Sequence, residues 1–260
     1  MKYNKDIKKR LFIAGFSNHA AEVAKDYGCS LEINETCISE NLDEEKVEET
    51  KANIRDMIAE GDCFNKKIFA HGPFTEITPD AMDPKVLKLT WDRYESAVKI
   101  CRDLGIKDIV FHSGYVPRTY YKEWHHERSV KFLKEFCTKV AGDMNIYIEN
   151  VFDDEPYMLR NLIEEIDLIN VKACLDIGHA NVASLPEYNV FDWIDVLRPV
   201  LGHTHIHDND GEIDLHLPLG CGVMEVDRTL KELLAMKDVS MTIESVDSRE
   251  SLDRIFSLLD

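Results

Sequence analysis

The sequence lacks any long apolar run. None of its uninterrupted apolar stretches approaches the roughly 20 residues that a membrane-spanning helix requires. Residues 1–6 lead into no apolar segment of the kind that forms the centre of a secretory signal. We therefore expect a cytoplasmic chain with no membrane partner.

Paired cysteines are missing as well. The seven cysteines are scattered and odd in number, and no two of them are spaced as Cys-x-x-Cys. This pattern argues against a disulfide framework and against a zinc site made of thiolates. We therefore expect any metal site to use nitrogen and oxygen ligands.

Basic residues are scarce. The chain has 31 Lys and Arg against 49 Asp and Glu, which gives a net charge of −18. A field of this sign repels polyphosphates unless basic residues gather in one place, and the sequence has only the short Lys8-Lys9-Arg10 triplet. A nucleic-acid partner is therefore not expected.

The sequence does contain a regular alternation of β-rich runs and longer stretches of helical period. Eight such units in about 250 residues match the size of a closed barrel. The turn after the first run, Gly15-Phe16-Ser17-Asn18, lacks the glycine-rich phosphate loop of a doubly wound open sheet. We therefore predict an α/β protein in which residues 1–260 form a single (β/α)8 TIM barrel. The expected strands are Leu11–Ala14, Ser30–Ile33, Lys67–Ala70, Asp108–Phe111, Asn145–Ile148, Lys172–Leu175, Gly202–Thr204 and Ser240–Ile243.

The residues that follow these strands carry the functional signal, because barrel enzymes build their active sites at the carboxyl ends of the strands. Gathering many carboxylates and imidazoles at one barrel mouth costs several kcal/mol unless cations neutralise them. Nitrogen and oxygen donors suit Zn, Mn, Co or Mg, and the histidines favour Zn or Mn. Six successive strands, the third to the eighth, are each followed by a potential ligand: His71, His112, Glu149, Asp176, His205 and Glu244.

Two loops add further ligand types. His179 lies three residues beyond Asp176, and Asp214 and His216 follow the seventh strand. The segment of the seventh strand and its loop contains His203, His205 and His207, one of which we expect to be a supporting or substrate-binding group rather than a ligand; we favour His205 as the ligand. The Gly220-Cys221-Gly222 turn fits either a close approach to a ligand or a plain turn.

These residues resemble those of the xylose isomerase-like TIM barrels, which include endonuclease IV and the sugar-phosphate isomerases and epimerases. The resemblance spans nearly the whole chain. Its most specific pieces are Phe111-His112-Ser113-Gly114, Ile148-Glu149-Asn150, Cys174 to Ala180, His205 to Gly222, and Ile243-Glu244.

The resemblance to the ketose epimerases implies one metal held by Glu149, Asp176, His205 and Glu244. It also implies that Glu149 and Glu244 exchange protons with the substrate. The expected function is a divalent-metal-dependent isomerase or epimerase of a small sugar or sugar phosphate, which moves a proton through a metal-stabilised enediolate.

The resemblance to endonuclease IV leaves a second function open, a zinc phosphoester hydrolase with a multinuclear site. It implies additional metal ligands at His71, His112, His179, Asp214 and His216. The loop between His205 and Asp214 is shorter than in the endonuclease signature and lacks its basic residue, which argues against a DNA substrate.

Four residues are candidates for substrate binding: His179, Arg118, Phe74 and Tyr115. Arg118 could pair with a phosphate or carboxylate, and Phe74 and Tyr115 could cover a sugar ring. The expected partner is a small carbohydrate, and the sequence leaves the oligomeric state open, a homo-oligomer included. Glu32 and Asn150 fit either a supporting role beside the site or a structural hydrogen bond.

Overall fold

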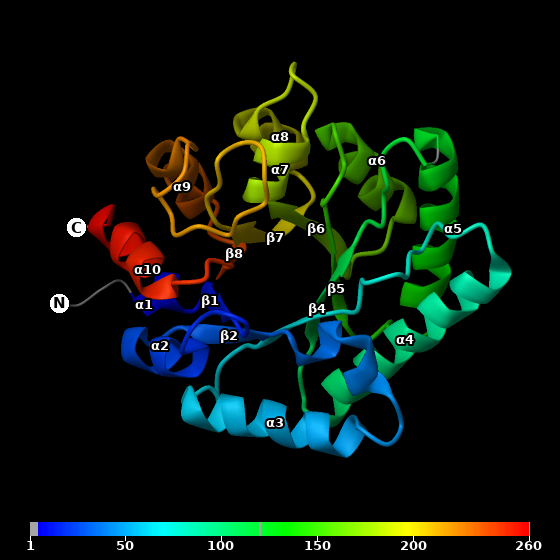
Figure 1. The fold of residues 1–260 in the computed structure, drawn as a ribbon, viewed down its shortest axis with the longest axis horizontal. Coiled ribbons are helices and arrows are strands. Elements are labelled where there is room, and N and C mark those ends of the chain that lie inside the picture. The colour runs from blue at the N-terminus through cyan, green and yellow to red at the C-terminus, as the bar shows by residue number, and fades with distance from the viewer. Residues whose placement is uncertain (1–4, 120, 260) are drawn as a thin grey trace.

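The computed structural model describes residues 5–119 and 121–259. Its eight strands run parallel and close into a barrel, because each strand pairs with its neighbours in sequence and β1 also pairs with β8. The predicted (β/α)8 TIM barrel is thereby confirmed (Figure 1). The strands are β1 (Leu11–Ala14), β2 (Ser30–Ile33), β3 (Phe69–His71), β4 (Asp108–His112), β5 (Asn145–Glu149), β6 (Val171–Asp176), β7 (Leu201–Ile206) and β8 (Ser240–Ile243).

Helices surround this ring of strands in Figure 1. The ring closes where α10 packs beside α2, and the Tyr27 hydroxyl donates to Asp253 over 2.7 Å. No helix in the described ranges combines the length and apolar character needed to cross a membrane. The helices are α1 (Lys5–Lys8), α2 (Ala20–Tyr27), η1 (Glu35–Cys37), η2 (Ser39–Leu42), α3 (Val47–Glu60), α4 (Pro84–Asp103), α5 (Lys122–Lys139), α6 (Pro156–Ile166), α7 (Ile177–Ala183), α8 (Val190–Leu197), α9 (Val226–Ala235) and α10 (Ser248–Ser257).

Three strands, β1, β2 and β8, have the predicted bounds, and the others differ at their ends. β7 runs from Leu201 to Ile206, three residues longer than predicted, and pairs with β6 on one side and with β8 on the other. β3 begins at Phe69, two residues later than predicted, and ends at His71.

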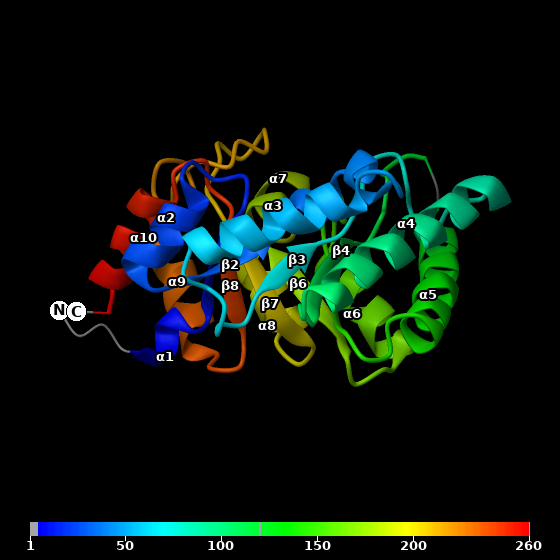
Figure 2. The same ribbon diagram turned by 90° about the horizontal axis from the view of Figure 1, so that it is seen from below.

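The barrel interior explains how the strands present the site. Side chains alternate between the two faces of a strand, so residues two apart both point into the barrel. Tyr147 and Cys174 therefore lie in an apolar cluster beneath Glu149 and Asp176, together with Phe12, Phe69 and Val110. Figure 2 shows α7 and the gold loop after β7 at the same end of the barrel, which is the end where the strands finish.

Candidate metal centre

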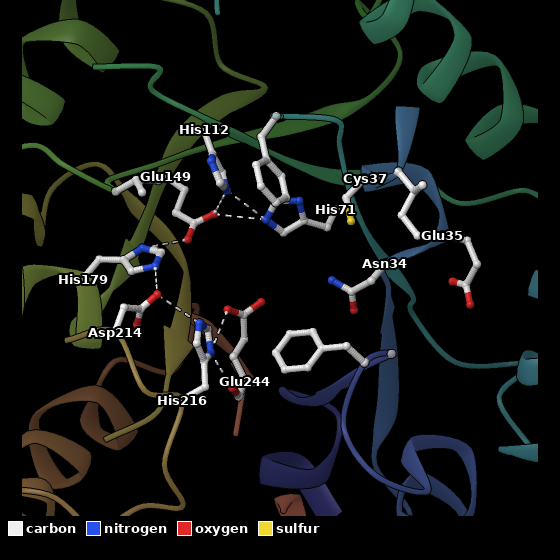
Figure 3. A pocket seen from close by; sticks show the side chains of 15 residues that line it. Asn34, Glu35, Cys37, His71, His112, Glu149, His179, Asp214, His216 and Glu244 are labelled. Atoms are coloured by element: carbon white, nitrogen blue, oxygen red, sulfur yellow. Dashed lines mark hydrogen bonds and ion pairs between the residues drawn. The ribbon is translucent and has the colours of Figure 1, made fainter. Parts of the chain in front are cut away.

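The strand register brings the predicted ligands into contact. His112 of β4 is paired with Glu149 of β5, and Asp176 of β6 is paired with His205 of β7. Glu244 follows β8 directly, and its backbone N–H donates to the carbonyl of Ile206. The six strand ends therefore meet at one mouth of the barrel, as Figure 3 shows for four of the six.

A central set consists of Glu149, Asp176, His205 and Glu244. One ligand atom from each lies within 4.8 Å of the others, and all four side chains are buried. His205 Nδ1 is 3.1 Å from Glu149 Oε1 and 3.4 Å from Glu244 Oε1. This set is the one that the sequence resemblance implied for a single metal.

Unpartnered atoms in this set test whether a cation fits. Both carboxylate oxygens of Glu149, Oδ2 of Asp176 and both ring nitrogens of His205 are buried, and the described residues provide no hydrogen bond to them. Buried carboxylate oxygens without a partner are costly, and a divalent cation would satisfy them together. The donor set of three carboxylates and one imidazole therefore fits a divalent metal.

Glu149 faces a second set through its other oxygen. Its Oε2 lies 3.3 Å from His71 Nε2 and 3.5 Å from His112 Nε2. The two imidazole nitrogens are 3.3 Å apart. His71 Nδ1 is 2.9 Å from the carbonyl of Gly72, so the proton belongs on Nδ1 and the Nε2 lone pair faces the cavity. Glu149 thus presents one oxygen to each of two sets of potential ligands.

A third set lies on the opposite side of the central one and consists of His179, His207, Asp214 and His216. Asp214 Oδ2 is 3.2 Å from His179 Nε2 and 3.1 Å from His216 Nε2. His207 joins this set, since its Nε2 is 3.5 Å from Asp214 Oδ1 and its ring stacks on His216 at 4.1 Å. The sequence left the role of His207 open, and the structure places it among potential ligands.

Gly178 makes room for His207. A Cβ atom at this position would lie 2.0 Å from the His207 ring, a distance that no real contact shows. Gly178 belongs to α7, which begins directly after β6 with the Asp176 carboxylate accepting from the His179 N–H. The glycine therefore lets α7 pass close to the imidazole that faces the third set.

The charges of the mouth keep Glu149 ionised and His112 neutral, whereas at His71, His179 and His205 the neighbouring acidic groups outweigh burial and raise the pKa, so a bound metal would have to displace protons from these rings. Burial by itself would raise the pKa of Glu149, but the imidazoles of His205 and His112 outweigh it and hold this pKa well below its usual range. Burial, partly offset by the charge of Glu149, lowers the pKa of His112 to about 3. An ionised carboxylate and a neutral imidazole are the states that a metal requires.

A cavity of about 440 Å³ opens above these sets. Figure 3 shows the metal-ligating candidates on one side and Asn34, Glu35 and Cys37 on the other. Among the described residues that line it there is no Lys and no Arg. The residues that line it are Gly15, Phe16, Asn34, Glu35, Cys37, Ile38, His71, Phe74, His112, Glu149, Val151, His179, Asp214, His216 and Glu244.

Two of the four predicted substrate-binding residues, Phe74 and His179, line this cavity, and two do not. Tyr115 is buried, lines an adjoining cavity of about 310 Å³, and packs its ring against His125 at 5.2 Å. Arg118 is exposed, has a φ of 64°, and is not among the lining residues. The structure thus brings neither of these two side chains to the cavity.

The wall on the β1 and β2 side was missed in the sequence. Asn34 and Glu35 follow β2, and Phe16 follows β1. The metal sets were predicted from His, Asp and Glu residues at the ends of successive strands. Phe16, Asn34 and Glu35 do not form such a series, so they were not predicted. The position of each residue at a strand end was the available signal.

Two open alternatives are settled by hydrogen bonds. The buried Asn150 amide makes two hydrogen bonds to the backbone of Asp176. Its Nδ2 donates to the carbonyl over 3.0 Å, and its Oδ1 accepts from the N–H over 2.9 Å. The N–H groups of Gly220 and Gly222 donate to the carboxylate of Asp208. Asn150 therefore ties β5 to β6, and the glycine segment is a turn that wraps Asp208.

Comparison with known proteins decides the family. A family model described as the xylose isomerase-like TIM barrel matches residues 21–257. The chain belongs to the xylose isomerase-like TIM barrels. This confirms the resemblance that its strand-end residues indicated.

Three proteins illustrate the neighbours of this xylose isomerase-like barrel. An uncharacterised protein of Methanocaldococcus jannaschii, MJ1311, is 28% identical over 214 residues, which cover 77% of this chain and 71% of that protein. The TTHB071 protein of Thermus thermophilus, in a structure soaked with ZnCl2, is 25% identical with a TM-score of 0.77, over 96% of this chain and 97% of its own. A D-psicose 3-epimerase from Clostridium cellulolyticum H10 with D-tagatose shares the fold at 20% identity, with a TM-score of 0.67 over 96% and 97% of the two chains.

Proposed function

We propose that this barrel is a divalent-metal-dependent isomerase or epimerase of a small sugar. The observation that carries the proposal is the central set, in which buried donor atoms of Glu149, Asp176 and His205 lack partners among the described residues, and of which Glu149 and Glu244 line a substrate-sized cavity. Fold neighbours that are named as sugar epimerases agree with it. Zn and Mn are the cations that the donor set favours.

Glu149 and Glu244 are the proposed proton carriers. They come from β5 and β8, and both line the cavity. One would take the proton from the carbon next to a carbonyl, and the other would return a proton to the same or the neighbouring carbon. A bound divalent cation would neutralise the charge that develops on the substrate oxygens.

The cavity favours an unphosphorylated sugar over a sugar phosphate. A phosphate group needs a cationic partner, and neither Lys nor Arg is among the described residues that line the cavity. Glu35 adds a carboxylate to the wall away from the metal sets, while Phe16 and Phe74 provide apolar surface for a sugar ring.

The test is proton exchange with solvent. The metal-loaded protein is incubated in D2O with a panel of free ketoses and aldoses, and deuterium at the carbon next to the carbonyl is followed by NMR. We expect exchange with at least one sugar, reduced on the order of 10³-fold or more in Glu149→Gln and in Glu244→Gln. The control is Glu164→Gln, at an exposed residue of α6 that pairs with Arg160. Full exchange in either cavity variant would remove that residue from the mechanism.

A second candidate function is a metal-dependent phosphoester hydrolase. It is favoured by one observation, the two oxygens of Glu149 that face two different ligand sets. A multinuclear centre of this kind activates water and holds a phosphoester between cations. Turnover of bis(p-nitrophenyl) phosphate without any sugar exchange would favour this function over the first.

A further inference from the structure

Glu32 is a buried carboxylate that neither the cavity nor the proposed mechanism uses. It lies on β2 between Leu31 and Ile33, it is 0% exposed, and it points into the barrel beneath the central set. A carboxylate buried at this depth is costly unless specific partners hold it. Its partners therefore indicate why the strand carries it.

One oxygen of Glu32 is fully engaged. Oε2 accepts from the hydroxyl of Thr242 and lies 3.2 Å from His203 Nε2. His203 is held in turn at its other nitrogen, Nδ1, which is 2.6 Å from the hydroxyl of Ser240. β7 and β8 thus fix this end of the carboxylate, and its orientation in the barrel is determined.

The other oxygen faces a metal-ligand candidate. Oε1 lies 3.1 Å from Nε2 of His205, and neither atom has a hydrogen-bond partner among the described residues. The opposite nitrogen of the same ring, Nδ1, faces Glu149 and Glu244. His205 thus lies between a carboxylate on one side and the cation site on the other.

We propose that Glu32 is a positioning residue for His205. With a cation bound at the central set, Glu32 Oε1 would accept the Nε2–H of the ring from its place 3.1 Å away, which leaves the lone pair on Nδ1, the nitrogen that faces Glu149, Asp176 and Glu244. Carboxylates behind ligating histidines have this effect in metal sites generally, where they fix the tautomer and raise the basicity of the ligand. The inference rests on the metal site of the proposed function but not on the reaction carried out there.

Zinc affinity is the first measurement. The full chain and its variants are titrated with Zn²⁺ against a chromogenic chelator. We expect Glu32→Ala to weaken the tightest zinc site about 10- to 100-fold. Glu32→Gln should weaken it less, because its amide oxygen still accepts a hydrogen bond without the charge.

The matched control is Asp108→Asn. Asp108 is also a buried carboxylate of the barrel, where it accepts from the Tyr147 hydroxyl and pairs with Lys67, and it belongs to none of the ligand sets. We expect this variant to lose stability while its zinc affinity remains within about twofold of that of the unmodified protein.

The tautomer of His205 is the second measurement, and it holds even if Glu32→Ala does not fold. In the zinc-loaded unmodified protein with ¹⁵N-labelled histidines, we expect NMR to show His205 protonated at Nε2 and bound through Nδ1. Zinc at Nε2, or a folded Glu32→Ala with unchanged zinc affinity, would overturn the proposal. Absence of sugar exchange alone would leave it standing, whereas a protein that binds no zinc would overturn both.

Discussion

His216 is the residue whose protonation reports most directly on the charge of the barrel mouth. Burial would lower its pKa, but the hydrogen bond to Asp214 and the charges of Glu244 and Asp176 outweigh burial and raise it to about 9. Its other nitrogen, Nδ1, is 2.7 Å from the backbone carbonyl of Glu244, so a protonated ring has an acceptor on both sides.

A pH dependence of the metal-free protein follows. Because the folded pKa of His216 is above its unfolded value of about 6.5, its contribution to stability is complete below that pH and is lost as pH rises through about 9. We expect the Tm of chelator-treated protein to fall over this range, and His216→Gln to reduce the fall. Metal affinity should change in the opposite direction, since metal displaces the proton.

The exposed His19 provides the comparison for this experiment, as His19→Gln should leave the fall in Tm unchanged. Equal pH profiles for the metal-free unmodified protein and for His216→Gln would show that the protonation of His216 does not stabilise the mouth.

At the same scale, the sequence predicted ligand types better than substrate contacts. The end of a strand fixes the position of Glu149 or Asp176, because the barrel pairs that strand with a neighbouring strand on each side. Arg118 lies in the long segment after β4, and its path depends on contacts that the sequence does not show. Gly114 in that segment has a φ of 82° and would clash with Thr78 if it carried a Cβ, so the segment is routed by packing against distant residues.

At the scale of an element, the loop after β7 is organised by one side chain. The buried carboxylate of Asp208 accepts from the backbone N–H groups of Gly220, Gly222 and Met224, at 2.9, 3.0 and 3.2 Å. Its backbone also exchanges two hydrogen bonds with Leu217. The loop that carries Asp214 and His216 therefore has a fixed return path to the barrel.

Asp208→Ala should destabilise the protein by roughly 2–4 kcal/mol, because several buried N–H groups lose their acceptor. Urea unfolding, followed by circular dichroism, measures this change. The control is Asp56→Ala on the exposed face of α3, where we expect a change within about 0.5 kcal/mol. A loss of stability no larger than that of the control would mean that the Asp208 hydrogen bonds do not organise the loop.

The eight strands were predictable from alternation, and two of the differences, at α7 and β7, have a physical reason that the sequence does not show. α7 was not predicted, because it begins at Ile177 without any loop and is too short to show a helical period. It depends instead on the Asp176 carboxylate at its N-terminus. β7 was predicted too short, because the polar His205 was taken as the residue that follows the strand, although it belongs to β7 and is buried.

At the scale of the whole molecule, the barrel places its most acidic and most imidazole-rich layer at one end, above an apolar layer. Glu32, Glu149, Asp176 and Glu244 are all buried there. Burying these carboxylates together is costly without a neutralising cation, and bound metal should therefore stabilise the folded state by mass action. The fold and this clustering were predictable from the sequence, but the number of cations depends on distances that only the structure gives.

Metal content by elemental analysis tests the central claim most directly. The protein is stripped with a chelator, reloaded with Zn²⁺ or Mn²⁺, freed of excess metal and analysed beside His205→Ala. We predict at least one divalent metal per chain, reduced in the variant, with a value near one favouring the isomerase and a value near three favouring the hydrolase. A folded protein that retains less than about 0.1 metal per chain, or a His205→Ala variant with undiminished metal, would contradict the claim.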